Sequence, residues 1–212
     1  LLMDLIFFGM QGAGKGTLGK SIAEKYNMQI FETGGELRKL SQEDSDLARK
    51  IKSIIESGQL VPNEVVMEIV ENFMNKIPPN SQILFDGIPR KIEQAKSLNE
   101  LLKKYNRNYR AVLINISKET AIHRLSTRRL CEKCKTVYPA EFKEGNCEKC
   151  GTPLITRSDD NPEAIRARLQ AFENETLPTI NLYGDKLITI DGEPKIDEVE
   201  NLALATLDPI MA

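Results

Sequence analysis

The sequence predicts an α/β fold in which a central parallel sheet of five strands carries helices on both faces. Short apolar runs rich in β-branched and aromatic residues alternate along the chain with longer segments of helical periodicity. Continuous apolar strands that alternate with helices are typical of a parallel sheet covered on both sides. Two stretches break the alternation: 33–62 is helical without a strand, and 130–157 is polar and holds the cysteines. We expect both to be insertions into the core.

The individual elements follow from local patterns. Five apolar runs are expected to be strands, and 29–31 is the weakest of them: 4–8 (DLIFF), 29–31 (QIF), 82–85 (QILF), 111–116 (AVLINI) and 186–190 (KLITI). Four segments are expected to be helices: 17–26, 63–74, 91–105 and 161–175. The first of these helices places Leu18, Ile22 and Tyr26 on one face, which would pack on the sheet.

Composition limits the classes of protein to which the chain can belong. Apolar residues make up 41% of the 212 residues, enough for a sizeable core without disulfides. Lys and Arg number 29 against 31 Asp and Glu, so there is no overall basic field for nucleic acid or an acidic membrane. No apolar run approaches the roughly 18–20 residues of a membrane helix, and the first residues lack the basic region of a signal peptide. We therefore expect a cytoplasmic protein.

A glycine-rich stretch, GMQGAGKGT (9–17), lies between the first expected strand and the first expected helix. This is the context of a phosphate-binding loop, where backbone N–H groups and a helix N-terminus attract phosphate. Lys15 would reach the β- and γ-phosphates, and the Thr17 hydroxyl would lie near Mg²⁺. The pattern is a variant, because Gly16 stands between the lysine and the threonine. The predicted nucleotide-binding residues of this loop are Gly12, Ala13, Gly14, Lys15, Gly16 and Thr17.

All four cysteines lie in one short stretch, as Cys131-x₂-Cys134 and Cys147-x₂-Cys150 with twelve residues between the pairs. This spacing is typical of a tetrahedral Zn²⁺ site. A redox role would need a pair at a helix start, and a nucleic-acid-binding zinc ribbon would need a basic face with stacking aromatics. We interpret the four thiolates as a structural zinc site that stabilises a segment too small to fold by itself.

Six stretches occur together in a fixed order: GMQGAGKGT (9–17), ETGGELR (32–38), FDGIPRKIEQA (85–95), RLSTRR (124–129), TRSDDNPEAIRARL (156–169) and LPTINLYG (177–184). In order and spacing they resemble the adenylate kinases over nearly the whole chain. The resemblance implies a P-loop core (1–32, 63–126 and 160–212), a helical insertion that binds a nucleoside monophosphate (33–62) and a zinc-binding lid (127–159). It also implies reversible transfer of the γ-phosphoryl group of MgATP to AMP, giving two ADP, with lid closure excluding water.

The resemblance also implies the binding residues, position by position. ATP would contact Gly12, Ala13, Gly14, Lys15, Gly16, Thr17, Arg128, Val137 and Tyr138. AMP would contact Thr33, Arg38, Gln59, Leu60, Val61, Gly87, Ile88, Pro89, Arg90, Gln94, Arg157 and Arg168. The partners would be ATP, AMP and ADP, without nucleic acid or membrane, and we expect a monomer. Gln94 suits recognition of a base edge, because its amide offers both a donor and an acceptor.

The charged residues fit phosphoryl transfer on chemical grounds. The reaction chiefly needs two polyanionic nucleotides to be positioned and their charge neutralised, for which the planar, permanently charged guanidinium is well suited. Asp86 ends a buried strand where a carboxylate can hold Mg²⁺-bound water, and the resemblance places Asp159 and Asp160 near the phosphates and metal waters. The catalytic set would be Lys15, Arg90, Arg124, Arg128, Arg157, Arg168, Asp86, Asp159 and Asp160.

No general base is expected in this reaction. The accepting phosphate of AMP is already ionised, so no hydroxyl has to lose a proton. His123, the one histidine of the chain, is therefore expected to be structural. The implied cofactors are Mg²⁺ with ATP, mostly through water, and structural Zn²⁺ held by Cys131, Cys134, Cys147 and Cys150.

Four positions depart from the family pattern without removing a phosphate ligand. Gln11 stands for a proline, Glu32 for a serine, Gly35 for an aspartate and Ile88 for a phenylalanine. The alternative is a related kinase that acts on UMP, CMP or GMP; Thr33, Gln94 and the long lid favour AMP. A switch GTPase is disfavoured, because the sequence has no NKxD motif and six arginines in motif register would have no use there.

Overall fold

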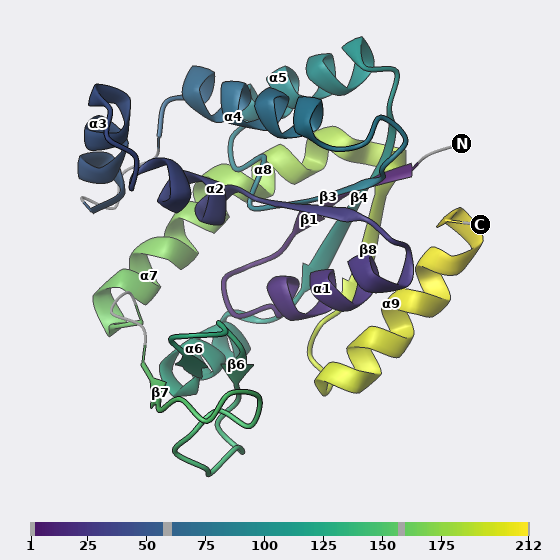
Figure 1. The fold of residues 1–212 in the computed structure, drawn as a ribbon. Helices are drawn as coiled ribbons and strands as arrows, with labels where there is room; N and C mark the ends of the chain where they lie inside the picture. Colours follow the sequence, from purple (N-terminus) through teal and green to yellow (C-terminus); the bar gives the residue numbers. More distant parts are fainter. Residues whose placement is uncertain (1–2, 57–60, 157–159, 212) are drawn as a thin grey trace.

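The computed structural model describes residues 3–56, 61–156 and 160–211. At its centre is a parallel sheet of five strands in the order β2-β3-β1-β4-β8 (Figure 1). The predicted parallel sheet is confirmed, and every strand lies on the apolar run that predicted it. The strands are β1 (Met3–Phe8), β2 (Gln29–Glu32), β3 (Ile83–Asp86), β4 (Asn108–Asn115) and β8 (Leu187–Asp191).

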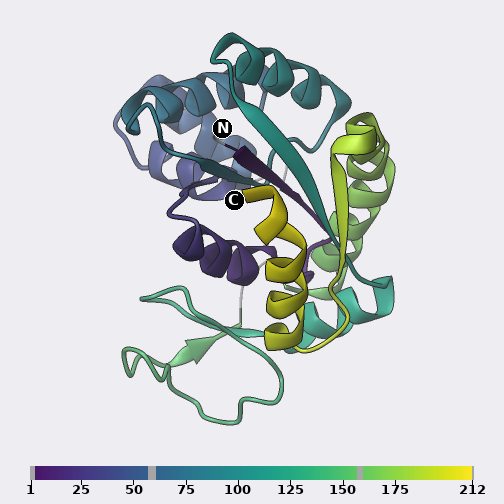
Figure 2. The same cartoon turned by 90° about the vertical axis from the view of Figure 1, so that its right-hand side faces the viewer.

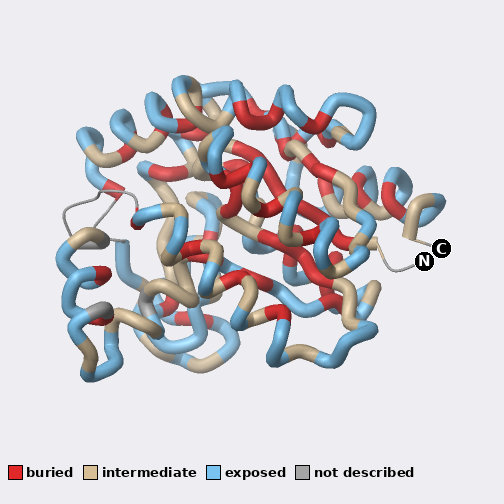
Figure 3. The backbone as a smooth tube through the Cα atoms, turned by 90° about the horizontal axis from the view of Figure 1, so that it is seen from above, coloured by how far each residue is buried: buried red, intermediate tan, exposed pale blue. Residues whose placement is uncertain are grey.

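The central strand β1 explains why the strand sequences are continuously apolar. Leu5 and Phe7 pack into the apolar cluster on one face of the sheet, and Ile6 and Phe8 pack into the cluster on the other. Successive side chains of a strand point to opposite faces, so a strand covered on both sides is apolar at consecutive positions, here Leu5 to Phe8. Figure 3 shows the result, with buried backbone through the middle of the molecule and exposed backbone around it.

Helices cover both faces (Figures 1 and 2). The cluster that contains Leu5 is completed by α1 (Lys15–Lys25), α6 (Lys118–Thr127), α7 (Pro162–Ala171) and α9 (Ile196–Met211). The opposite cluster is completed by α4 (Asn63–Lys76), α5 (Ile92–Lys104) and α8 (Leu177–Ile180). None of the described helices has both the length and the apolar character needed to cross a membrane.

The last expected helix differs from the prediction. The range 161–175 is α-helical only to Ala171, after which a π-helical turn, η1 (Phe172–Thr176), leads into α8 and a 3₁₀ segment, η2 (Asn181–Lys186). Pro178 supplies the reason, because it has no N–H for the carbonyl of Asn174 and its ring needs room beside that carbonyl. The helical pattern continues through this region, but the hydrogen bonding changes.

The two stretches that break the alternation lie outside the central sheet. The first forms α2 (Thr33–Leu40) and α3 (Asp46–Glu56) between β2 and α4. The second forms an antiparallel sheet of three short strands in the order β6-β5-β7, which extends away from the core beyond α6 (Figure 2). Its strands are β5 (Arg129–Cys131), β6 (Val137–Tyr138) and β7 (Leu154–Ile155). The domain bounds stay a prediction.

Candidate active site and cysteine cluster

The glycine-rich loop joins the carboxyl end of β1 to the start of α1, as predicted. Gly12 has φ of 89°, and a Cβ at this position would lie 3.1 Å from the carbonyl oxygen of Ala121. Gly14 precedes α1 with φ of 87°, so both turns require glycine. Gly14, Gly16 and Thr17 are exposed. The first N–H groups of a helix have no partner within the helix, and here they are open to a phosphate.

Lys15 lies over this loop. Its Nζ donates to the carbonyl oxygens of Gly9 at 2.7 Å and Met10 at 3.0 Å. Burial lowers the pKa of Lys15 to about 8, although the nearby Asp86 carboxylate acts in the opposite direction. A cation held only by carbonyl oxygens in a poorly solvated place gains more from a phosphate than an exposed lysine would.

The ends of β2 and β3 bring together the residues expected around AMP. Asp86 ends β3 beside the register partner Glu32 of β2, and its carbonyl accepts a bond from the Thr33 hydroxyl at 3.3 Å. Burial raises the pKa of the Asp86 carboxyl and Lys15 opposes this, while the charge of Glu32 raises it further. Asp86 therefore lies near the cation of Lys15 at the carboxyl end of the parallel strands.

Arg90 and Gln94 lie on the segment that follows β3. The Nε of Arg90 donates to the carbonyl of Gly87 at 3.0 Å, and the buried Gln94 side chain accepts from the Arg90 backbone N–H at 2.8 Å. Gln94 thus fixes the backbone from which the Arg90 guanidinium extends. Other residues expected near AMP form a buried wall here: Val61, Ile88 and Pro89.

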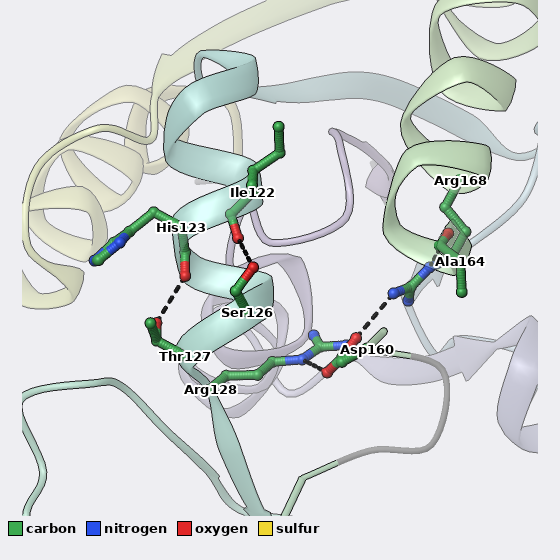
Figure 4. Close-up of polar contacts among 8 residues, drawn as sticks. All are labelled: Ile122, His123, Ser126, Thr127, Arg128, Asp160, Ala164 and Arg168. Carbon is green, nitrogen blue, oxygen red and sulfur yellow. Dashed lines mark hydrogen bonds and ion pairs between the residues drawn. The ribbon is translucent and has the colours of Figure 1, made fainter. Parts of the chain in front are cut away.

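Arg128, Asp160 and Arg168 form a charged group at the two ends of the cysteine-bearing segment (Figure 4). The Asp160 carboxylate accepts from Arg128 Nε at 2.5 Å and Arg128 Nη2 at 2.8 Å, and from Arg168 Nη2 at 2.8 Å. Burial alone would raise the pKa of Asp160, but the hydrogen bonds from both arginines outweigh it and hold that pKa below its usual range. Two cations that repel one another are held together by one buried carboxylate.

Arg124 and His123 lie apart from this group. Arg124 donates to three carbonyl oxygens of the loop after β8: Gly192 at 2.9 Å, Glu193 at 2.9 Å and Pro194 at 3.2 Å. The His123 ring points away from Arg128, and the backbone carbonyl of His123 accepts a bond from the Thr127 hydroxyl (Figure 4). The remaining predicted residues lie outside the described part of the structure: the Arg38 side chain, Gln59, Leu60, Arg157 and Asp159.

The four cysteines form one cluster in the small sheet. Their Sγ atoms all lie within 4.8 Å of one another, with Cys131 to Cys150 at 3.3 Å and Cys134 to Cys147 at 3.4 Å. None is in a disulfide. Four thiolates around Zn²⁺ at about 2.3 Å each would be about 3.8 Å apart, so the cluster fits a tetrahedral ion with small adjustments.

Two backbone turns of the same shape hold the cysteines. In the first, Cys131 N–H donates to the Thr136 carbonyl, and Lys135 has a positive φ of 58°. In the second, Cys147 N–H donates to the Thr152 carbonyl at the matching position. The hydroxyl of each threonine contacts the second cysteine of its pair. The sequence reasoning missed these threonines, although the repeat CEKCKT (131–136) and CEKCGT (147–152) would have revealed them.

Two predicted ATP contacts occupy opposite sides of β6. Val137 is exposed, whereas the Tyr138 ring is buried and its hydroxyl donates to Cys147 Sγ at 3.2 Å. Adjacent residues of a strand point to opposite faces, so only one of the two side chains can face outward. The Tyr138 side chain is therefore part of the cysteine-bearing sheet, and a contact from this residue to a nucleotide would come from its backbone.

Comparison with known proteins gives consistent results. A family model described as Adenylate kinase matches residues 7–188, which is most of the chain. The chain belongs to the adenylate kinase family. The adenylate kinase of Fervidobacterium nodosum is 38% identical over 205 residues, covering 93% of this chain and 94% of that protein. The adenylate kinase of Staphylococcus epidermidis is 37% identical, covering 97% of this chain and 99% of that protein. The adenylate kinase of Alkaliphilus oremlandii is 39% identical, covering 93% of this chain and 94% of that protein.

Membership of the adenylate kinase family accounts for features that no single motif explains. The chain is a nucleoside monophosphate kinase. Its glycine-rich loop, with the half-buried Lys15, stays the predicted site of the nucleotide donor. Membership of this family also disfavours a switch GTPase, because neither the family model nor the relatives named above belong to that class.

Proposed function

We propose that this adenylate kinase transfers the γ-phosphoryl group of MgATP reversibly to AMP, giving two ADP. The observation that carries the proposal is the position of the described charged groups at the carboxyl ends of the parallel strands. Lys15 follows β1, Asp86 ends β3 and Arg90 follows it, so a donor phosphate on the loop would face an acceptor phosphate on Arg90. Ligands of open α/β sheets bind at this edge.

The chemistry follows from the charges of these groups. The loop N–H groups and Lys15 would hold the donor phosphates, and Arg90 with Arg38 would hold the phosphate of AMP. Arg128 and Arg168 would approach the transferring group, where negative charge is spread over its oxygens. AMP needs no general base, because its phosphate is already ionised at neutral pH.

The Asp86 carboxylate fits a role beside Mg²⁺. Carboxylate oxygens and water are the ligands that this ion prefers, and Asp86 lies close enough to Lys15 for each to affect the pKa of the other. When bound with ATP, Mg²⁺ supplies charge neutralisation between the β- and γ-phosphates. Asp86 would orient water of the metal shell, and Lys15 would hold the adjacent phosphate oxygens.

Selection of adenine would come from Thr33 and Gln94. Gln94 Oε1 is engaged by the Arg90 N–H, so its amide NH₂ is the group left to donate to a base edge. A donor at this position fits an acceptor nitrogen of adenine.

The remaining parts of the proposal are a cytoplasmic monomer without a nucleic-acid partner, a core of 1–32, 63–126 and 160–212, an AMP-binding insertion of 33–62 and a lid of 127–159.

Coupled assays with ATP as donor test the acceptor. AMP, UMP, CMP and GMP are each titrated, and we expect kcat/KM for AMP to exceed the others by at least a hundredfold. A Gln94→Leu variant should lose much of this preference, and KM for AMP should also rise, because leucine cannot accept from the Arg90 N–H. A larger kcat/KM with UMP, CMP or GMP would favour the related kinases instead.

The cysteine cluster is proposed to hold structural Zn²⁺. All four thiolate positions are filled by protein, so no open position remains for metal catalysis, and the ion would stiffen the lid. Metal analysis of the purified protein should give one zinc per chain. Cys131→Ser should lose that zinc and melt at a lower temperature, whereas Cys131→Ser with full metal content and unchanged melting would contradict the proposal.

A further inference from the structure

Each sulfur atom of the cysteine cluster has a polar neighbour besides the other three sulfur atoms. Cys134 Sγ contacts the Thr136 hydroxyl at 3.1 Å, and Cys150 Sγ contacts the Thr152 hydroxyl at 3.4 Å. Cys131 Sγ accepts from the backbone N–H of Cys134 at 3.4 Å. These three partners belong to the same turn as the cysteine that they contact.

The fourth sulfur differs, because its partner comes from another strand. Cys147 Sγ accepts from the hydroxyl of Tyr138, which lies on β6 between the two cysteine pairs. The Tyr138 hydroxyl in turn accepts from the backbone N–H of Glu148 at 3.0 Å. That bond occupies the hydroxyl oxygen and leaves its hydrogen for the sulfur. Tyr138 is 5% exposed and Cys147 is 2% exposed, so water does not compete for either group.

The Tyr138 ring is also fixed. It packs on Phe142 with ring centroids 4.4 Å apart, and the Arg129 guanidinium lies 5.9 Å from the centre of the Phe142 ring. Arg129 and Tyr138 are register partners in the pairing of β5 with β6. The two strands, the aromatic pair and the sulfur cluster therefore share one small buried core.

We propose that Tyr138 is a positioning residue that couples the metal of the cysteine cluster to β6, the strand that presents Val137 outward. The inference rests on the proposed zinc site. It goes beyond that site because it assigns a role to the Tyr138 hydroxyl, which is not a metal ligand. Val137 is 48% exposed. It points outward because its neighbour Tyr138 points inward, and adjacent residues of a strand face opposite sides. When metal binds Cys147, the Tyr138 hydroxyl and hence β6 are held in one place.

The physical effect is that of a hydrogen bond to a metal-bound thiolate. Four thiolates around Zn²⁺ carry a net charge of about −2, and a buried O–H donor stabilises that charge. Outer hydrogen-bond partners of metal ligands typically change metal affinity by about 10–100-fold when they are removed. Loss of the hydroxyl would also leave the Glu148 N–H without its acceptor.

Tyr138→Phe in the full-length protein tests the proposal, because it removes the hydroxyl and keeps the ring against Phe142. Zinc affinity is measured by competition with a chromogenic chelator, and we expect it to fall by about 10–100-fold. Tyr105→Phe is the matched control: its hydroxyl bonds Glu71 and Asn75 on α4, away from the cysteine cluster, so zinc affinity should stay at the wild-type value. Equal zinc affinity in wild type and Tyr138→Phe would overturn the inference.

A second measurement separates coupling from a folding defect. With cobalt in place of zinc at saturation, the ligand-field bands of Tyr138→Phe should still be those of a tetrahedral four-thiolate site, and bands of another coordination geometry would overturn the proposal. At limiting zinc, KM for ATP should rise at least threefold in Tyr138→Phe and return at saturating zinc, while KM for AMP stays constant. If KM for ATP in Tyr138→Phe does not depend on the zinc concentration, the coupling is refuted. If the wild-type protein binds no zinc, the proposed metal site itself is wrong.

Discussion

Replacing Asp160 with asparagine should destabilise the junction between the cysteine-bearing segment and the core. Asp160 has a side chain with no exposed surface, and it accepts two hydrogen bonds from Arg128 and one from Arg168. Asparagine has nearly the same shape, but its NH₂ group would face one of the arginine donors. The variant therefore removes the charge, removes at least one hydrogen bond and leaves two guanidinium groups close together without a counter-charge.

The size of the effect follows from burial. Breaking a fully buried ion pair typically costs about 3–5 kcal/mol, and each charge-assisted hydrogen bond contributes about 1.5–3 kcal/mol. Arg128 and Arg168 are 17% and 23% exposed, so water can solvate them in part after the change. We expect Asp160→Asn to lower the free energy of unfolding by about 2–3 kcal/mol at neutral pH. We also expect kcat to fall at least tenfold, because Arg128 and Arg168 lose their common anchor.

Urea unfolding at 25 °C measures the first effect, and the coupled kinase assay measures the second. Asp44→Asn is the control, because Asp44 also pairs with an arginine, Arg49, but on the surface, so its midpoint should match the wild type. The pKa of Asp160 is lowered in the folded state, so its contribution is present above about pH 4 and lost as pH falls through the folded-state pKa. If Asp160→Asn unfolds at the same urea concentration as Asp44→Asn, the reasoning is wrong.

Three further predictions concern other parts of the molecule. Lys15→Met should lower kcat at least a hundredfold in the kinase assay, and in the wild type KM for ATP should rise as pH passes about 8, where Lys15 loses its charge. Arg107→Ala should lower the free energy of unfolding by about 3–5 kcal/mol, because it leaves Asp4, which is 1% exposed, without its counter-charge. Gly12→Ala should raise KM for ATP at least tenfold, because φ is 89° there and the new Cβ would press on the carbonyl of Ala121.

Each of these predictions has an internal check. Lys15→Met should not lower the free energy of unfolding. The pKa of Lys15 falls from 10.5 to about 8 on folding, so its charge destabilises the folded wild type below pH 8, and this destabilisation disappears between pH 8 and 10.5. Methionine carries no charge and avoids it. Arg107→Ala should leave both KM values unchanged, because Arg107 lies at the opposite ends of the strands from the nucleotide loop. Gly12→Ala with an unchanged KM for ATP would show that the loop tolerates a side chain there.

The elements set by local pattern could be predicted from the sequence. The apolar run LIFF predicted β1 because a strand covered on both faces is apolar along its buried length, and GMQGAGKGT predicted the loop because its glycines allow positive φ. The cysteine cluster followed from spacing alone. In these cases the residues that make the feature are close in the sequence, so one short stretch carries the whole signal.

Features that join distant residues could not be predicted in the same way. Asp4 and Arg107 are 103 positions apart, and their pairing depends on β1 and β4 being neighbours in the sheet. The inward direction of Tyr138 depends on how the two cysteine turns pack against β6, which the alternation of a two-residue strand does not determine. In both cases only the assembled fold decides which side chains meet.

The position of Asp160 connects the metal cluster with the phosphate site. Arg128 ends α6 where the chain enters the cysteine-bearing segment, and Asp160 lies where the chain leaves it. Their ion pair joins both connections, and Arg168 ties the same carboxylate to α7. If the proposed zinc stiffens this segment at its far end, a segment closed by one carboxylate at its base would bring Arg128 to the phosphates only as a unit. Loss of zinc and loss of the Asp160 charge should therefore impair the same step, and the double variant Cys131→Ser/Asp160→Asn should lower kcat by less than the product of the two single effects.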